Sequence, residues 1–151
     1  MTGVLIAAAA IVLITVTVFV SQINVDQPAQ DDPYKNWNKS GPFNINQFEY
    51  QIGELIFISV NGLRPNDVGS IVFILPNGTT TYLAIPFDGN AKPVFNQYFK
   101  PAISKARQIC DINDLVGEWT VLFNGTDYAP INFKILNETE SGEEHNFSRV
   151  C

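Results

Sequence analysis

The side chains that could carry out catalysis are few and poorly placed. His145 is the only histidine, and it lies in a Gly/Glu-rich stretch where a solvated side chain is expected. A Ser-His-Asp or Cys-His relay would have to recruit this one residue. None of the 15 acidic residues lies in an aromatic-rich motif that would raise its pKa for glycoside hydrolysis. We therefore expect that the protein is not an enzyme.

Ligands for a metal or cofactor are equally scarce. A type 1 copper centre would need two histidines beside a cysteine, which this sequence lacks. Carboxylates bind calcium, and two short acidic clusters are present: Asn66 with Asp67, and Asp111 with Asn113 and Asp114. Neither has the spacing of an EF-hand loop, so turns stabilised by Asp and Asn side chains are the simpler interpretation. The sequence predicts no metal and no cofactor, and it contains no glycine-rich phosphate loop.

The two cysteines, Cys110 and Cys151, form an isolated pair. In an exported domain such a pair can form one disulfide, whereas a metal site usually needs more ligands. We predict a disulfide that fastens the C-terminal residues to the domain. The alternative is two free thiols, of which Cys151 would be exposed and reactive.

Five Asn-x-Ser/Thr sequons are candidate sites of N-glycosylation. All follow the hydrophobic start of the chain and fall in expected turns and tails, which fits a surface that faces outward. Some sequons arise by chance in a chain rich in Asn and Thr. The candidate residues are Asn38, Asn77, Asn124, Asn137 and Asn146.

The overall charge excludes one class of partner. The 151-residue chain carries a net charge of −6 and has no run of Lys or Arg, so it would repel nucleic acid phosphates. Hydrophobic residues make up 46% of the chain and are concentrated at its start. This asymmetry predicts a membrane segment followed by one small domain, and no binding of nucleic acid.

The hydrophobic segment covers residues 3–20, which are uncharged throughout. As a helix it would be about 27 Å long, enough to cross a thin bilayer core. The first basic residue is Lys35, so the basic region of a cleavable signal peptide is missing and an uncleaved anchor is favoured. Asp26, Asp31 and Asp32 follow the segment and favour an N-in, C-out orientation. We expect a helix over residues 1–23 and a proline-containing stalk over residues 24–42.

Four small residues in this segment would let another helix approach closely. They are Ala7, Ala8, Ala9 and Ala10. The segment resembles the N-terminal helices of archaeal pilins, archaellins and the single-pass stator proteins of the archaellum, which also carry a β-sandwich outside the membrane. The resemblance implies a helix that can leave membrane lipid and pack with like helices. The alternative is a lone anchor whose surface contacts only membrane lipid.

The rest of the chain, residues 43–151, reads as short strands separated by turns. Asn77-Gly78 and Asn124-Gly125 each predict a β-hairpin turn, because both residue types tolerate positive φ. Tyr34 and Trp37 could lie at the membrane interface, but the long stalk favours packing on the domain. The expected strands are 48–52, 55–60, 70–75, 79–85, 94–99, 117–123 and 128–136, with a short helix at 103–109.

A second resemblance covers about residues 48–136. It rests on Tyr50-Gln-Ile-Gly-Glu54, on Pro76-Asn-Gly78, and on Gly117-Glu-Trp119-x-Val121. These tracts resemble the Ig-like modules of bacterial and archaeal surface proteins and macroglobulin-type domains. The resemblance implies an all-β, Ig-like β-sandwich behind a single N-terminal helix. The Cys…Trp…Cys order of antibody domains is absent, because Cys110 precedes Trp119.

Three functions remain open on this sequence. The first is a structural or interaction protein of the cell surface that self-assembles through its helix as a pilin-like filament subunit. The second is a single-pass accessory or stator subunit of a larger membrane complex. The third is a tethered extracellular binding module, whose candidate contact residues are Tyr82, Phe87, Tyr98 and Phe99. These rings could instead fill the sandwich core. We expect either a membrane protein with an extracytoplasmic domain or an extracellular filament.

Overall fold

The computed structural model describes residues 35–151, which form nine strands and three short 3-10 helices. The helix and most of the stalk expected from the sequence lie outside this part of the chain. No helix within it is long and apolar enough to span a bilayer. The strands are β1 (Asn38–Ser40), β2 (Phe43–Ile45), β3 (Glu49–Ile52), β4 (Ile56–Asn61), β5 (Val68–Ile74), β6 (Thr81–Asp88), β7 (Val94–Phe99), β8 (Gly117–Asn124) and β9 (Ile131–Thr139). The 3-10 helices are η1 (Lys105–Arg107), η2 (Ile112–Asp114) and η3 (Glu144–Phe147).

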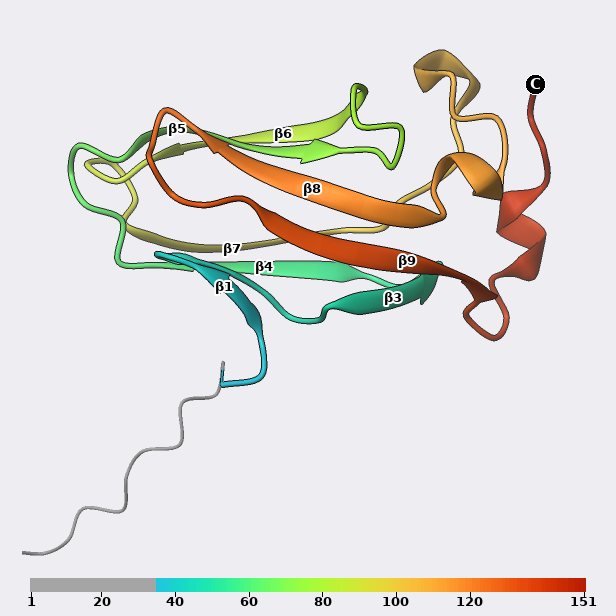
Figure 1. Ribbon diagram of the computed structural model, residues 1–151, viewed down its shortest axis with the longest axis horizontal. Helices are drawn as coiled ribbons and strands as arrows, with labels where there is room; N and C mark the ends of the chain where they lie inside the picture. Colours follow the sequence, from blue (N-terminus) through green and yellow to red (C-terminus); the bar gives the residue numbers. More distant parts are fainter. Residues whose placement is uncertain (1–34) are drawn as a thin grey trace, which may run out of the picture. The chain divides into compact units, whose positions relative to one another are not determined.

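Two sheets face each other across a shared core (Figure 1). One sheet has the strand order β1-β2-β4-β7 and the other the order β3-β9-β8-β5-β6. Neighbouring strands are antiparallel except β3 and β9, which are parallel. The prediction of an all-β domain is therefore confirmed for residues 35–151.

Large aromatic side chains join the two sheets. Phe43 of β2 stacks on Phe123 of β8 with ring centroids 4.1 Å apart, and Phe73 of β5 meets Phe99 of β7 at 4.8 Å. Trp119 of β8 is fully buried, and its indole N–H donates to the Leu115 carbonyl at 2.8 Å. This bond satisfies the only polar atom of the ring. The alternating apolar residues of the strands thus form one continuous core.

Both predicted hairpin turns are present, and in each the glycine adopts the positive φ. Gly78 has φ +74°, while the Asn77 side chain accepts hydrogen bonds from the Thr79 and Thr80 amides. Gly125 has φ +92°. Glycine meets this requirement without the steric penalty of a Cβ. The two turns connect β5 to β6 and β8 to β9.

The chain joins the sheet earlier than the expected domain start at residue 43. β1 pairs with β2, with Asn38 opposite Ile45 and Ser40 opposite Phe43. Residues 38–40 therefore belong to the folded part. Trp37 packs edge-on against Phe57, with centroids 5.7 Å apart, as expected from the sequence. Tyr34 lies outside the described residues.

The short helix predicted over residues 103–109 is wrong. Only Lys105–Arg107 form a single 3-10 turn, closed by an antiparallel bridge between Ser104 and Ile109. Gln108 has φ +59° and ends the turn in the left-handed region. Ile109 is buried and Ile103 packs partly buried against the core, whereas Lys105–Arg107 between them remain exposed, so no apolar helical face is covered.

Candidate functional site

The outer edge of β7 is the most apolar exposed strand edge in the described part of the chain. β7 lies at the end of its sheet and pairs only with β4. Val94 and Tyr98 are 53% and 65% exposed, whereas Phe95 and Phe99 turn inward and pack against the core. Side chains alternate along a strand, so Val94 and Tyr98 share the outer face with the residue between them, Asn96.

An aromatic row crosses the outer face of the same sheet. Phe57 of β4 lies directly opposite Tyr98 of β7 in the register, and Trp37 packs on Phe57 from the other side. Cross-strand aromatic pairs of this kind stabilise a sheet. Trp37, Phe57 and Tyr98, called the aromatic row below, therefore lie in one line across the sheet that ends at the β7 edge.

The four aromatic residues proposed as binding contacts separate into two groups. Phe87 is 5% exposed, and Phe99 and Tyr82 pack against the core, where Tyr82 meets Trp119 at 5.2 Å. Only Tyr98 presents its ring to solvent. Sequence reasoning missed Val94 and Phe48 as exposed apolar residues. For Val94, the alternation of the strand does not reveal which face is covered. Phe48 was expected to begin a strand over 48–52 but lies in a bend just before β3, where the alternation does not apply.

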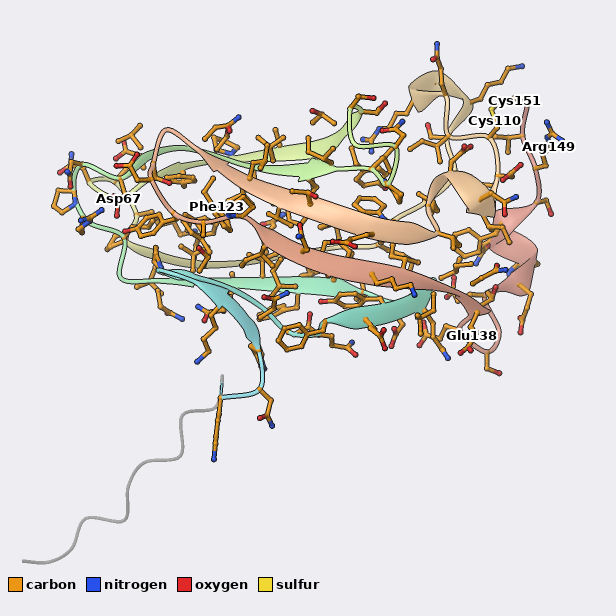
Figure 2. The ribbon with its side chains drawn as sticks, in the orientation of Figure 1. Asp67, Cys110, Phe123, Glu138, Arg149 and Cys151 are labelled. Atoms are coloured by element: carbon orange, nitrogen blue, oxygen red, sulfur yellow. A yellow bond between two sulfur atoms is a disulfide. The ribbon has the colours of Figure 1, made fainter. Side chains whose placement is uncertain are left out.

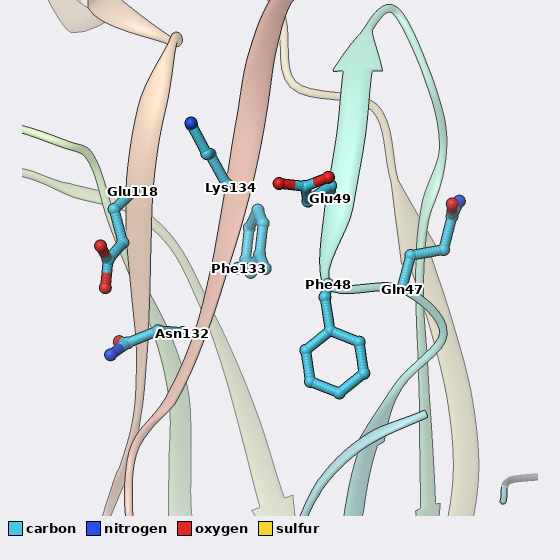
Figure 3. Close-up of a pocket in the computed structure, with 7 residues that line it drawn as sticks. All are labelled: Gln47, Phe48, Glu49, Glu118, Asn132, Phe133 and Lys134. Carbon is cyan, nitrogen blue, oxygen red and sulfur yellow. The ribbon is translucent and has the colours of Figure 1, made fainter. Parts of the chain in front are cut away.

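A hollow of about 430 Å³ lies against the outer face of the other sheet (Figure 3). Phe48 is 56% exposed beside it, and the register places Lys134 of β9 between Glu49 of β3 and Glu118 of β8. The amides of Gln47 and Asn132 complete the polar lining around Phe48 and the inward-facing Phe133. An exposed ring beside amides and carboxylates has the composition of a shallow polar binding surface.

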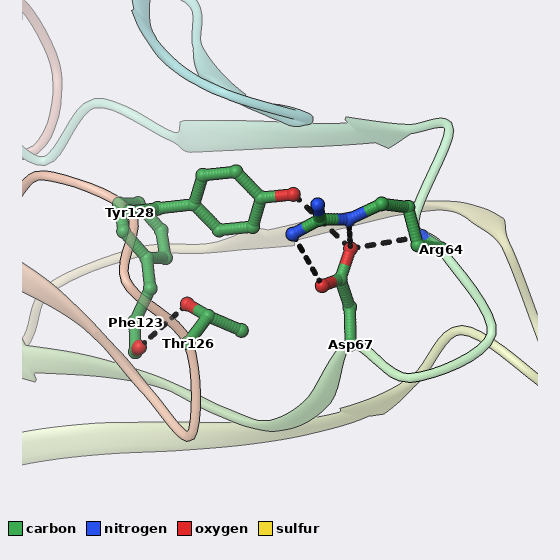
Figure 4. Close-up of polar contacts among 5 residues, drawn as sticks. All are labelled: Arg64, Asp67, Phe123, Thr126 and Tyr128. Carbon is green, nitrogen blue, oxygen red and sulfur yellow. Dashed lines mark hydrogen bonds and ion pairs between the residues drawn. The ribbon is translucent and has the colours of Figure 1, made fainter.

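Asp67, one of the residues considered for calcium, is buried, and both of its carboxylate oxygens accept hydrogen bonds from neighbouring residues (Figure 4). Its Oδ2 accepts hydrogen bonds from the Arg64 amide at 2.8 Å and from the Tyr128 hydroxyl at 3.1 Å. Its Oδ1 accepts one from Arg64 Nη2 at 3.1 Å. Hydrogen bonds from the Arg64 guanidinium and amide lower the pKa of Asp67. The carboxylate therefore ties the β4–β5 loop to the β8–β9 loop.

The second acidic cluster caps a short helix. The Asp111 side chain accepts from the Asn113 amide, and Asp114 accepts from the amides of Cys110 and Asp111, which makes a capping box at η2. Across residues 35–151, no group of three or more His, Cys, Asp or Glu side chains is placed to hold a metal. His145 lies exposed in η3.

A disulfide joins Cys110 and Cys151, whose Cα atoms are 5.1 Å apart (Figure 2). The bond is supported by a backbone hydrogen bond from the Val150 amide to the Cys110 carbonyl at 2.9 Å. A salt bridge of 2.8 Å from Lys100 Nζ to Glu143 holds the segment before η3. The C-terminal residues are thus fastened to the domain at several points.

The five sequon asparagines differ in what their side-chain amides do. Three amides donate hydrogen bonds: Asn38 to the Asn132 carbonyl at 2.6 Å, Asn77 to Thr80 Oγ1 at 2.8 Å, and Asn146 to Glu143 at 2.9 Å. Asn124 and Asn137 are exposed and make no side-chain hydrogen bond within residues 35–151. Glycan transfer would have to break a bond at the first three and none at the last two.

Comparison of the chain with models of protein families, with curated proteins and with solved structures finds no match.

Proposed function

We propose that this protein is a non-enzymatic structural and interaction protein of the cell surface, whose hydrophobic helix packs with like helices to form a pilin-like filament. The observation that carries the proposal is the pairing of two features in one chain. An uncharged segment, residues 3–20, precedes an all-β domain closed by the Cys110–Cys151 disulfide. Disulfides persist in oxidising compartments outside the cytosol. The domain therefore belongs on the extracytoplasmic side of the membrane, opposite the N-terminus of the hydrophobic segment.

The strand order supports an Ig-like sandwich for this domain. β3 pairs in parallel with β9 at one end of a sheet that continues through β8 and β5 to β6. β2 and β4, which precede and follow β3 in the chain, belong to the opposite sheet. Two facing sheets that are largely antiparallel, with early strands divided between them, support an Ig-like surface module. The exposed sequons at Asn124 and Asn137 support a glycosylated outer surface.

Electron microscopy of the full chain, with and without detergent, tests the proposal. We expect filaments that persist after detergent is removed. Ala8→Glu should abolish them, because a charge inside a packed helix bundle is left without a partner. Ala8→Ser is the matched control and should preserve them, since a small residue still permits close helix approach. Discrete detergent-bound particles in place of filaments would contradict the filament function and favour an accessory subunit of a membrane complex.

The hollow beside Phe48 favours a second candidate function, a tethered module that binds saccharides. A sugar ring could stack on the exposed face of Phe48 while its hydroxyls bond to Asn132 and Glu118. Titration of the full chain with methyl glucopyranoside, methyl mannopyranoside and N-acetylglucosamine, followed by NMR, tests this function. Shifts confined to this hollow and lost in Phe48→Ala would support it. Unchanged spectra at high sugar concentration would exclude it.

A further inference from the structure

The four strand edges of the sandwich are not equally protected. Natural sheets protect exposed edges with short strands, charged side chains or proline. β1 has three residues and carries Lys39, and β3 has four and carries Glu49. β6 contains Pro86 and ends at Asp88. β7 has six residues, Val-Phe-Asn-Gln-Tyr-Phe, with no charge and no proline.

The flanks of β7 limit any added strand to these six residues. Pro93 and Pro101 lack backbone N–H donors, so neither can extend a ladder of hydrogen bonds. Lys92 precedes one proline and Lys100 precedes the other. Both charges are engaged: Lys92 lies over the Phe95 ring at 5.9 Å, and Lys100 bonds to Glu143. Within residues 35–151 only β4 pairs with β7.

From these observations, we infer that β7 pairs antiparallel with β7 of a second copy of this chain, with Asn96 on the two-fold axis. The two four-stranded sheets then form one continuous sheet. This interface deepens the proposed self-assembly and rests on it, because a pair of six-residue strands is a small contact that dense packing of the helices would reinforce.

The side chains of β7 select this register. Residues directly opposite in a sheet share a face, so a two-fold axis at Asn96 sets Val94 of each copy opposite Tyr98 of the other. These are the two exposed apolar residues of the edge, and each would cover its counterpart. The aromatic row would then continue from Trp37 through Phe57 and Tyr98 into Val94 of the second copy.

Neighbouring registers fit less well. An axis at Gln97 would set Val94 opposite Lys100 and leave Tyr98 beside Asn96. An axis between Asn96 and Gln97 would bring inward-facing residues opposite outward-facing ones, which the pleat forbids. The register at Asn96 does place Lys92 opposite Lys100 of the second copy, where Glu143 supplies the opposite charge.

Single cysteines introduced on β7 of the full chain test the inference. The native cysteines are bonded to each other, so an introduced thiol is the free one. In Asn96→Cys the two thiols meet across the axis with Cα atoms about 4.5–5.5 Å apart, within reach of a disulfide. In Val94→Cys the two Cα atoms are separated by four residues along the strands, roughly 14 Å, and cannot be bridged.

We expect mild oxidation to yield at least about tenfold more disulfide-linked dimer for Asn96→Cys than for Val94→Cys or Tyr98→Cys alone. An equimolar mixture of Val94→Cys and Tyr98→Cys chains should cross-link, since those residues face each other. Asn96 is exposed and its side chain makes no hydrogen bond within residues 35–151, so the substitution should leave folding unchanged, as fluorescence of the buried Trp119 would report. Thr81→Cys, on the β6 edge, is the control for random collision.

Three results would overturn the inference. The first is cross-linking of Gln97→Cys in place of Asn96→Cys, the second is equal cross-linking of Asn96→Cys and Thr81→Cys, and the third is the absence of the Asn96→Cys cross-link. If electron microscopy shows filaments but Asn96→Cys does not cross-link, the proposed function is supported and the β7 interface is contradicted. A cross-link in chains that form no filaments would support the interface and contradict the filament function.

Discussion

Removal of the Cys110–Cys151 disulfide should lower the stability of the domain by an amount that follows from the chain length it closes. The bond spans 41 residues, a segment that contains β8 and β9. The loop-entropy relation gives about 13 cal/mol/K for this length, or ~4 kcal/mol at 25 °C. The figure is an upper value, because the hairpin of β8 and β9 retains some order in the unfolded chain.

The perturbation is the double variant Cys110→Ser, Cys151→Ser, which leaves no lone thiol. Urea unfolding of the full chain in mild detergent can be followed by the fluorescence of Trp119, which is fully buried. With an m value near ~2 kcal/mol/M, a loss of ~4 kcal/mol moves the midpoint down by about 2 M. Reductant should move the wild-type midpoint to that of the variant and leave the variant unchanged.

A midpoint for the double variant within about 0.25 M of wild type would refute the reasoning, since it corresponds to only ~0.5 kcal/mol. The same conclusion follows if reductant frees both thiols of the wild type without changing its midpoint. The C-terminal residues would then be held by the Glu143–Lys100 salt bridge, the packing of Phe147 and the backbone hydrogen bond from Val150 to residue 110.

Three further predictions concern single residues. Asp67→Asn should lower the urea midpoint at pH 7 and have no such effect in acid. The Arg64 hydrogen bonds depress the pKa of Asp67 in the folded state, so the ionised carboxylate stabilises the fold above pH ~4. This stabilisation disappears as the pH falls through the folded-state pKa of Asp67. Burial raises the pKa of Tyr50, so wild-type stability should fall above pH ~10, where the unfolded chain ionises, and Tyr50→Phe should flatten that fall in pH-dependent urea titrations. Gly69→Ala should cost about 3 kcal/mol or more in thermal melts, because its Cβ would lie 1.8 Å from the Asn124 carbonyl oxygen; an unchanged Tm would contradict the close approach of β5 and β8.

The sequence predicted well those elements whose signals are local. β7 was expected over residues 94–99 and spans Val94–Phe99, and the Asn-Gly turns were found from two residues each. Alternation of Trp119, Val121 and Phe123 identified the buried face of β8, because a period of two marks a sheet with one face covered. These features depend on neighbouring residues only.

Features that depend on distant residues could not be predicted. β1 and β2 have three residues each, too short for alternation to show. β2 forms because it pairs with the edge of β4, and β1 forms because it pairs with β2. The parallel pairing of β3 with β9 joins segments that are about 85 residues apart. The burial of Asp67 depends on Tyr128 from another loop, so the sequence alone indicated only a turn. The exposure of Val94 and Tyr98 likewise follows from the position of β7 at an edge.

The most direct test of the central claim is an intact mass measurement of the native protein, made on the membrane or filament fraction of its cells. The proposed function requires that residues 1–23 are retained, so the mass should include them, with any excess accounted for by glycans on the sequons. A native protein that begins near Asn24 and is recovered as a freely soluble monomer would contradict the claim that this segment anchors or assembles the molecule.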